Sequence, residues 1–159
     1  ALRPELIVTL QPTSPKRTGE ENHACNELQR KHDADSVVSV CVSEPHPSWM
    51  FRIETNAAGT RVLVPCLAGD TPEKTRRQDF EPLYRLNGAM VYVTTYDLLM
   101  RQHKIIGGMT IPYPMEAWLS VDLDHPEDWV LGELIMQHQA DIRRRISDIE
   151  SEREHLAKR

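Results

Sequence analysis

The chain has 159 residues, of which 40% are hydrophobic and 27% charged, and its formal net charge is −5 at pH 7. This composition is typical of one globular domain with its own core, and the acidic balance gives no general attraction to nucleic acid. No apolar run is long enough to cross a membrane. The three cysteines are scattered and lack metal-ligand spacing, which favours a reducing cytoplasm.

The first predicted element is an apolar, β-branched strand over Leu6–Leu10. Two prolines in the loop that follows, Gln11–Thr18, prevent the strand from continuing. Thr18 and Glu21 have the spacing of a capping box, so we expect a helix from there to about His32. Polar residues after such a strand are where α/β folds place ligand contacts, and a simple turn is the alternative for this loop.

A second strand is predicted over Asp35–Val42, and its apolar content indicates burial on both faces. Strand, helix and strand together predict a right-handed βαβ unit and a parallel sheet. The chain opens at Ala1 and reaches a buried-strand pattern almost at once. We therefore expect it to begin in the middle of a fold and to be an incomplete fragment.

The next region, about residues 44–80, has a different character. Phe51–Thr55 and Thr60–Pro65 flank Asn56–Gly59, which is the signature of a hairpin. The part that follows is polar and carries Lys74, Arg76 and Arg77. Because the region has few apolar residues, we expect an arm that packs on another subunit or crosses the active site.

The chain is predicted to return to the core as one strand over Tyr84–Val93. Arg85 and Asn87 are two residues apart, so their side chains should lie on the same face of that strand. Gly88 permits close approach of a ligand or another backbone. A helix is expected after Thr94 or Thr95, and then a short edge strand over Met109–Pro114.

An acidic stretch, Ser120–Trp129, is expected to begin as a strand end and to finish as a helix start. Asp122 and Asp124 alternate with apolar residues and should project together, and two adjacent carboxylates suit Mg²⁺. The alternative is a solvated turn with a helix cap. Pro126 favours the first helical position, which makes His125 the N-cap and leaves the two aspartates without a structural role.

From Pro126 the chain is predicted to be helical to near its end. An apolar face that includes Leu131, Leu134 and Ile135 should close the domain as far as Met136. Beyond Asp141 the sequence is dense in charge, which fits a projecting helix, with a short coiled coil as a further option. A nucleic-acid patch at the arginines of this tail is the weaker interpretation, because acids interleave with them.

Three segments, in this order, resemble the acylneuraminate cytidylyltransferase family, the CMP-sialic acid synthetases and their relatives. They are Gln11–Pro15 with Arg17, Arg77 with Tyr84–Ala89, and Val121–Asp124 with Pro126–Asp128. The resemblance runs from about Leu6 to about Met136. It implies part of a Rossmann-like α/β nucleotidyltransferase fold with a three-layer sheet, a dimerisation arm and a long C-terminal helix.

The resemblance also implies an activity. It is the transfer of CMP from CTP to a nine-carbon keto sugar acid of sialic, legionaminic or pseudaminic type, with Mg²⁺ and release of pyrophosphate. Asp122 and Asp124 resemble the metal-binding pair of this family. The same resemblance makes Asp122 and Asp124, together with Arg77, the candidate catalytic residues.

The remaining candidate residues are also implied by the resemblance. Gln11, Arg85 and Asn87 resemble residues of the substrate pocket. Arg77 resembles a basic residue that acts near the phosphates and is delivered by the swapped arm of a homodimer.

The resemblance leads to a division of the chain. Residues 1–140 are expected to form a partial cytidylyltransferase domain, with the arm at about residues 44–80, and residues 141–159 a charged helical tail. The family's glycine-rich nucleotide-binding segment would lie upstream of Ala1, so the fragment by itself is expected to be inactive. The alternative is a non-catalytic short relative that acts as an assembly or sugar-binding module.

Overall fold

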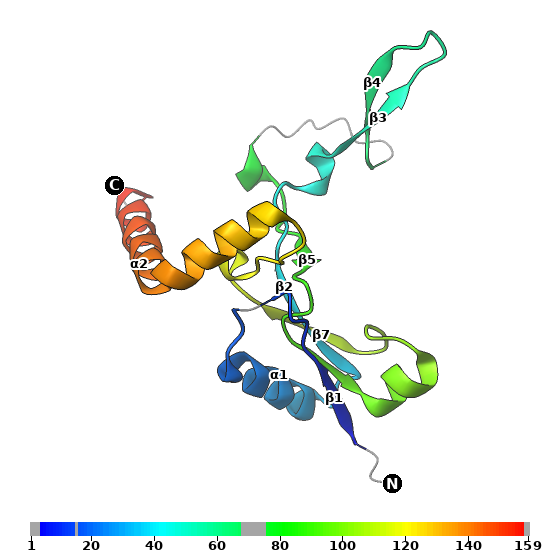
Figure 1. The fold of residues 1–159 in the computed structure, drawn as a ribbon, viewed down its shortest axis with the longest axis vertical. Helices are drawn as coiled ribbons and strands as arrows, with labels where there is room; N and C mark the ends of the chain where they lie inside the picture. The colour runs from blue at the N-terminus through cyan, green and yellow to red at the C-terminus, as the bar shows by residue number, and fades with distance from the viewer. Residues whose placement is uncertain (1–3, 15, 68–75, 158–159) are drawn as a thin grey trace.

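The computed structural model describes residues 4–14, 16–67 and 76–157. A sheet of five strands forms its centre, and Figure 1 shows how the other elements are arranged around it. The strands lie in the order β1, β6, β2, β5, and β7 pairs separately with β2. Their bounds are Leu6–Thr9 for β1, Ser36–Val42 for β2, Tyr84–Leu86 for β5, Tyr92–Thr95 for β6 and Thr110–Pro114 for β7. Ala1, Pro15 and Lys74 lie outside the described residues.

The predicted parallel sheet is wrong for most of the strand pairs. β6 lies between β1 and β2 and is antiparallel to both. β1 and β2 therefore point the same way without pairing with each other, and among the described strands only β2 and β7 form a parallel pair. The fold is mixed α/β with mostly antiparallel pairing, because a strand from much later in the chain enters between the two strands that the sequence places first.

Helix α1 (Gly19–His32) begins where the capping box predicts. The Thr18 hydroxyl accepts the Glu20 N–H at 3.2 Å, and the Glu21 carboxylate accepts the Thr18 N–H at 2.5 Å. Both partners satisfy N–H groups that the first helical turn leaves without a carbonyl. α1 therefore starts at a position that local chemistry fixes.

The core lies on both faces of β2, which is buried from its first residue to Cys41. On one face Cys25 of α1 packs with Val37 and Val93. On the other face Val38 packs with Tyr92. The predicted burial of this strand on both faces is confirmed.

The predicted single strand over Tyr84–Val93 is interrupted, and β5 and β6 are its two ends. Gly88 has φ of 71° and Ala89 has φ of 48°, so the backbone is not extended at these two residues, which lie between β5 and β6. This break turns the carbonyl groups of both residues toward the loop after β1, as described below.

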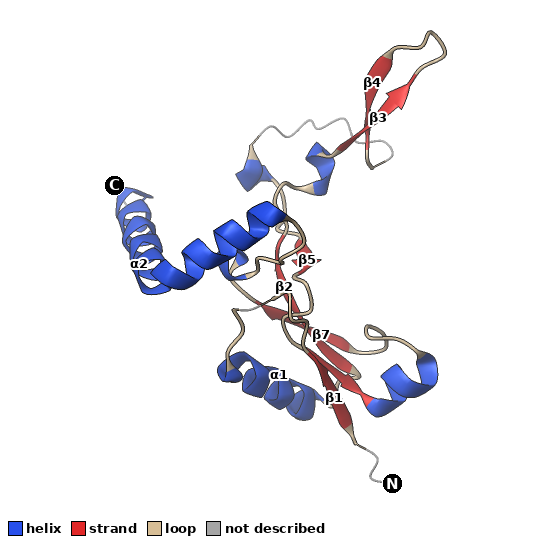
Figure 2. Ribbon diagram, viewed as in Figure 1, coloured by secondary structure: helices blue, strands red, loops and turns tan. Residues whose placement is uncertain are grey.

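Strands β3 (Phe51–Thr55) and β4 (Arg61–Pro65) form the predicted hairpin, which stands off from the body of the molecule (Figure 2). Asn56 accepts the backbone N–H groups of Ala58 and Thr60 through its side-chain oxygen, and both bonds close the turn. Apolar side chains on the hairpin are exposed, including Ile53 and Leu63.

The segment after β6 forms a short π-helical turn, Asp97–Arg101, at the place where the sequence predicts a helix. The Thr95 hydroxyl accepts the N–H of Leu98 at 3.4 Å, so the helical turn begins after one of the two threonines named from the sequence. β7 follows as an edge strand, and its prolines at positions 112 and 114 suit an edge.

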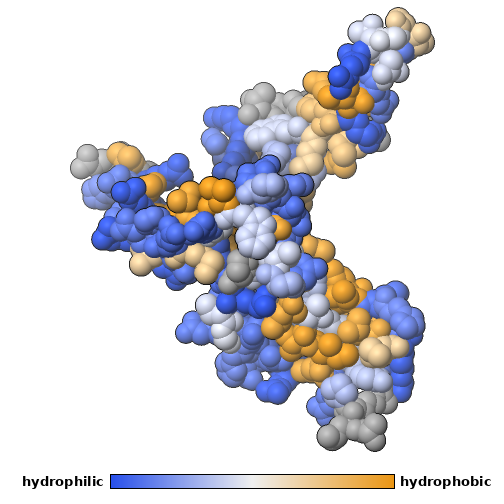
Figure 3. Space-filling model, viewed as in Figure 1, coloured by the Kyte–Doolittle hydropathy of each residue, from blue (hydrophilic) through white to orange (hydrophobic). Residues whose placement is uncertain are grey.

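Helix α2 (Pro126–Ala157) kinks at His138, where φ is −118° and ψ is 18°. Its predicted role in closing the domain through Met136 is largely wrong. Ile135 is buried, but Leu131, Leu134 and Met136 are about half exposed. Figure 3 shows apolar surface along this part of the helix. The reason is that α2 docks along one narrow stripe, where Gly132 lies close to Leu123.

Within the described ranges, no helix has both the length and the apolar character needed to span a membrane.

Candidate functional site

Three segments that are distant in sequence meet beyond the end of β1. The Gln11 N–H donates to the Ala89 carbonyl at 3.2 Å, and the Ser14 hydroxyl donates to the Gly88 carbonyl at 2.9 Å. The Leu123 N–H donates to the Thr13 carbonyl at 3.0 Å. The loop after β1 is therefore fixed between the break that follows β5 and the acidic stretch.

The loop is also held from within. The Arg17 guanidinium donates to the carbonyls of Gln11 at 2.6 Å and Ser14 at 3.2 Å. The Gln11 side chain itself is exposed and makes no hydrogen bond to the described residues. The Gln11 amide is therefore exposed to solvent at the end of β1.

Asp122 is packed against Gly88. A Cβ added at Gly88 would lie 2.6 Å from the Asp122 Cγ, so only glycine leaves room for this carboxyl group. The Oδ1 of Asp122 is buried and has no hydrogen-bond partner among the described residues. A buried carboxylate oxygen without a donor is costly unless a ligand satisfies it.

That orphaned oxygen and the chemistry of the donors fit a hard divalent cation. Asp124, two residues further on, is exposed and can offer a second carboxylate. Within the described residues, no group of three or more His, Cys, Asp or Glu side chains could hold a metal by itself. Two carboxylates with the remaining positions taken by phosphate and water is the arrangement Mg²⁺ commonly adopts.

The acidic stretch does not begin as a strand, which corrects the expectation from sequence. Ser120 follows a 3₁₀ turn, Ala117–Leu119, and the next residues are not part of a strand before the helix begins. The turn ends in a hydrogen bond from the Ser120 hydroxyl to the Glu116 carbonyl at 3.0 Å. The backbone hydrogen bond to Thr13, rather than a sheet neighbour, then holds the stretch in place.

The start of α2 agrees with the prediction that Asp128, and not Asp122 or Asp124, stabilises the helix terminus. The Asp128 carboxylate accepts the N–H groups of Asp124 at 3.1 Å and His125 at 2.7 Å, and the helix begins at Pro126. Asp128 therefore serves the helix terminus. The side chains of Asp122 and Asp124 accept no hydrogen bond from the described residues, so neither has such a structural task.

Arg85 and Asn87 both reach Ser120, which agrees with the prediction that they share a face. The Arg85 guanidinium donates to the Ser120 carbonyl at 3.5 Å, and the Asn87 amide donates to the Ser120 hydroxyl at 3.1 Å. Asn87 is fully buried and also accepts the Ser39 hydroxyl at 2.7 Å. Asn87 thus ties β2 to the acidic stretch, whereas Arg85 is exposed.

Tyr92 is a residue that the sequence did not single out. It is buried, and its burial raises the pKa of its phenol, with a smaller contribution in the same direction from the negative charge of Asp122. A hydrogen bond with the backbone of Ala89 opposes the shift in pKa. Tyr92 therefore lies close to the Asp122 carboxylate, and the sequence carried no signal for this beyond its place in an apolar run.

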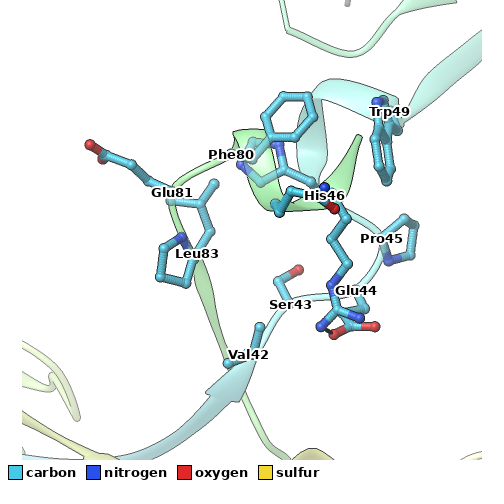
Figure 4. A pocket seen from close by; sticks show the side chains of 12 residues that line it. Val42, Ser43, Glu44, Pro45, His46, Trp49, Phe80, Glu81 and Leu83 are labelled. Atoms are coloured by element: carbon cyan, nitrogen blue, oxygen red, sulfur yellow. Dashed lines mark hydrogen bonds and ion pairs between the residues drawn. The ribbon is translucent and has the colours of Figure 1, made fainter. Parts of the chain in front are cut away.

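Arg77 is not part of this cluster. It forms an ion pair with Glu44 at the root of the arm, beside a cavity of about 600 Å³ (Figure 4). In the same cavity the rings of His46 and Phe80 stack with centroids 4.4 Å apart, and Trp49 meets Phe80 edge-on. Within one chain, Arg77 and the two aspartates occupy different places.

Comparison with known proteins bears on this arrangement. No family model matches the chain. The chain is 31% identical over 134 residues to N-acylneuraminate cytidylyltransferase of Streptococcus agalactiae serotype V, which covers 83% of this chain. It is 30% identical over 138 residues to CMP-N,N'-diacetyllegionaminic acid synthase of Legionella pneumophila, which covers 82% of this chain. The resemblance to the acylneuraminate cytidylyltransferase family is confirmed.

The chain spans only part of the length of these cytidylyltransferases, 31% of the Streptococcus protein and 53% of the Legionella protein. The segments that carry the cytidylyltransferase resemblance are largely those that the fold brings together. Ser14 and Gly88, for example, are 74 residues apart in sequence and share a hydrogen bond.

Proposed function

We propose that the protein containing this chain is a nucleotidyltransferase that moves CMP from CTP to a keto sugar acid of sialic, legionaminic or pseudaminic type. The products are the CMP-sugar acid and pyrophosphate. The observation that carries the proposal is the meeting of the Gln11 loop, Gly88 and Asp122 around a buried carboxylate oxygen that none of the described residues satisfies. The names of the relatives support the class of reaction.

In this reaction the anomeric hydroxyl of the sugar acid attacks the α-phosphorus of CTP, and the bond to the β-phosphate oxygen breaks. Such a transfer depends on positioning and on neutralising charge rather than on a covalent protein intermediate. Asp122 and Asp124 would hold Mg²⁺, which when bound neutralises charge on the phosphates. The space that Gly88 leaves for the Asp122 carboxyl group supports this role.

Arg85 is proposed to bind the carboxylate of the sugar acid. It is exposed, and its guanidinium lies near the Ser120 carbonyl, two residues before Asp122. A planar guanidinium can donate two parallel hydrogen bonds to a carboxylate, which fixes the orientation of the sugar. The exposed Gln11 amide is proposed as a second substrate contact, and Asn87 is proposed to hold the pocket through Ser120.

The arm is proposed to form a homodimer and to carry Arg77 toward the partner's phosphate site. Exposed apolar residues on the hairpin, Ile53 and Leu63 among them, support a partner for it. Light scattering of the complete gene product at micromolar concentration tests this proposal. A monomer would remove the case for an arm-delivered arginine.

The activity is tested on the complete gene product by measuring pyrophosphate release with CTP, Mg²⁺ and a panel of sialic-type sugar acids. Asp124→Asn should cut turnover strongly and leave stability almost unchanged, because this side chain accepts no hydrogen bond from the described residues. Asp128→Asn is the matched control and should show the reverse pattern, since Asp128 caps α2.

Failure of every such sugar in a folded dimer would overturn the proposal. It would favour the alternative, a non-catalytic relative that acts as an assembly module or a sugar-binding module. Sugar binding that is unchanged by removal of Mg²⁺ would identify the sugar-binding module.

The three cysteines are free, which supports a reducing compartment, and we place the protein in the cytoplasm.

A further inference from the structure

The tail of α2 carries an apolar seam that nothing in the cytidylyltransferase reaction uses. Ile142, Ile146, Ile149 and Leu156 follow one another at spacings of four, three and seven residues, with Arg153 at the intervening seam position. Alternating steps of four and three residues place side chains on one line of a helix and are the signature of a coiled-coil seam. The seam therefore marks a face made for another helix.

The outer half of this face is exposed, whereas Ile142 and Ile146 are half-buried. Ile149 is 52% exposed and Leu156 is 69% exposed, and Figure 1 shows the last part of α2 running away from the body toward the C-terminus. Arg143, beside the seam, lies over the Trp118 ring at 5.9 Å and so fixes the root of the tail to the body. Arg145 and Glu152, on the other side, make no ion pair within the described residues.

We propose that the tails of two copies of this chain pair as an antiparallel two-helix coiled coil. With Ile146 of one copy opposite Ile149 of the other, the two central layers of the seam are apolar on both sides. Ile142 then meets Arg153, and Gln139 meets Leu156, in layers related by the two-fold axis. In this register Arg145 of each copy lies beside Glu152 of the other, because both flank the same side of the seam.

Charge decides the direction of pairing. The tail begins with three arginines, Arg143–Arg145, and continues with four acids, Asp148, Glu150, Glu152 and Glu154. A parallel pair would set Arg153 against Arg153 inside the seam, where like charges repel. An antiparallel pair places the arginines at the start of each tail, Arg143–Arg145, beside Glu150 and Glu152 of the other. A second copy of the same chain is therefore a complementary partner.

The test is a charge exchange read by sedimentation of the full chain. The arm offers a separate apolar surface, so all variants carry Ile53→Glu and Leu63→Lys, a cross-strand pair on the hairpin that keeps opposite charges together. In this background the intact tail should give a monomer–dimer equilibrium. Arg145→Glu alone, or Glu152→Arg alone, should weaken dimerisation about tenfold by replacing two attractive contacts with repulsive ones.

The double variant Arg145→Glu with Glu152→Arg should restore dimerisation to within about threefold, since the antiparallel pairs are re-formed in reverse. In a parallel coil Arg145 would face Glu150 of the other copy instead, and the double variant would not restore dimerisation. Arg144→Glu, on the outer face of the tail, is the control and should leave the equilibrium unchanged. A monomer with the intact tail, or no rescue by the double variant, would overturn the proposal.

Discussion

Gly88→Ala tests the packing that holds Asp122 in the candidate site. Gly88 has φ of +71°, a conformation that alanine adopts only with strain, and the new methyl carbon would lie 2.6 Å from the Asp122 Cγ. The substitution therefore acts in two ways at one position. It strains the backbone, and it forces the carboxyl group away from the loop after β1.

The two effects have separate magnitudes. A left-handed conformation costs a residue with a Cβ about 1–2 kcal/mol, and the overpacking of a tight contact typically costs about 1–3 kcal/mol. We expect Gly88→Ala to lower the free energy of unfolding by about 2–5 kcal/mol in total. Displacement of Asp122 should also weaken the dependence of stability on Mg²⁺.

A double-mutant cycle separates the two costs by urea denaturation. In an Asp122→Ala background the methyl group has space, so Gly88→Ala should lower the free energy of unfolding only by the backbone strain of about 1–2 kcal/mol. Gly59→Ala is the control for backbone strain alone, because Gly59 has φ of +79° and no atom lies within 4 Å of an added Cβ. An equal cost of Gly88→Ala with and without the Asp122 carboxyl group would refute the packing argument.

Three further substitutions test the buried polar groups. Asn87→Ala should lower the free energy of unfolding by about 2–3 kcal/mol, because the hydroxyl groups of Ser39 on β2 and Ser120 in the acidic stretch would each lose a hydrogen bond. An unchanged urea midpoint would contradict this. Lys16→Met should raise the thermal midpoint, with a gain of about 1–3 kcal/mol, because the buried Nζ has no partner among the described residues and its burial lowers the pKa of the ammonium group. A loss of stability would mean that the ammonium group is satisfied. Burial, and then the charge of Glu21, raise the pKa of the Cys25 thiol from 9.0 to about 12. The unfolded chain then loses this proton at lower pH than the folded chain, so stability should fall as pH rises from 9.0 toward about 12. Cys25→Ala should remove this part of the dependence of the free energy of unfolding on pH, as measured by urea titrations at alkaline pH. An unchanged pH dependence would count against the burial of the Cys25 thiol.

Local chemistry was sufficient to predict the helix starts and the hairpin. Thr18 and Glu21 bond to backbone groups within their own turn, and Pro126 suits the first position of α2 whatever surrounds it. Asn56 likewise closes its turn with bonds to residues two and four positions away. Interactions between residues so close in sequence are present in the sequence pattern itself.

The candidate site was predictable in its parts but not in its assembly. Arg85 and Asn87 share a face because any extended segment has a two-residue period. Their common partner, Ser120, lies about 35 residues away in sequence and comes to them through the tertiary fold. The predicted roles of Arg77, Arg85 and the two aspartates rest on resemblance and stay predictions.

What the sequence alone determined is therefore the helix starts, the hairpin, the buried strand β2 and the motifs that these segments carry. Only the tertiary structure decided the order of strands in the sheet, the break at Gly88 and Ala89, and the exposure of the apolar residues of α2. Strand pairing depends on which distant segment offers the better partner, and the burial of a helix face depends on what covers it. Asp122 shows the difference most clearly: its position in sequence suggested a ligand, but its orphaned oxygen exists only because Gly88 and the Thr13 loop close around it.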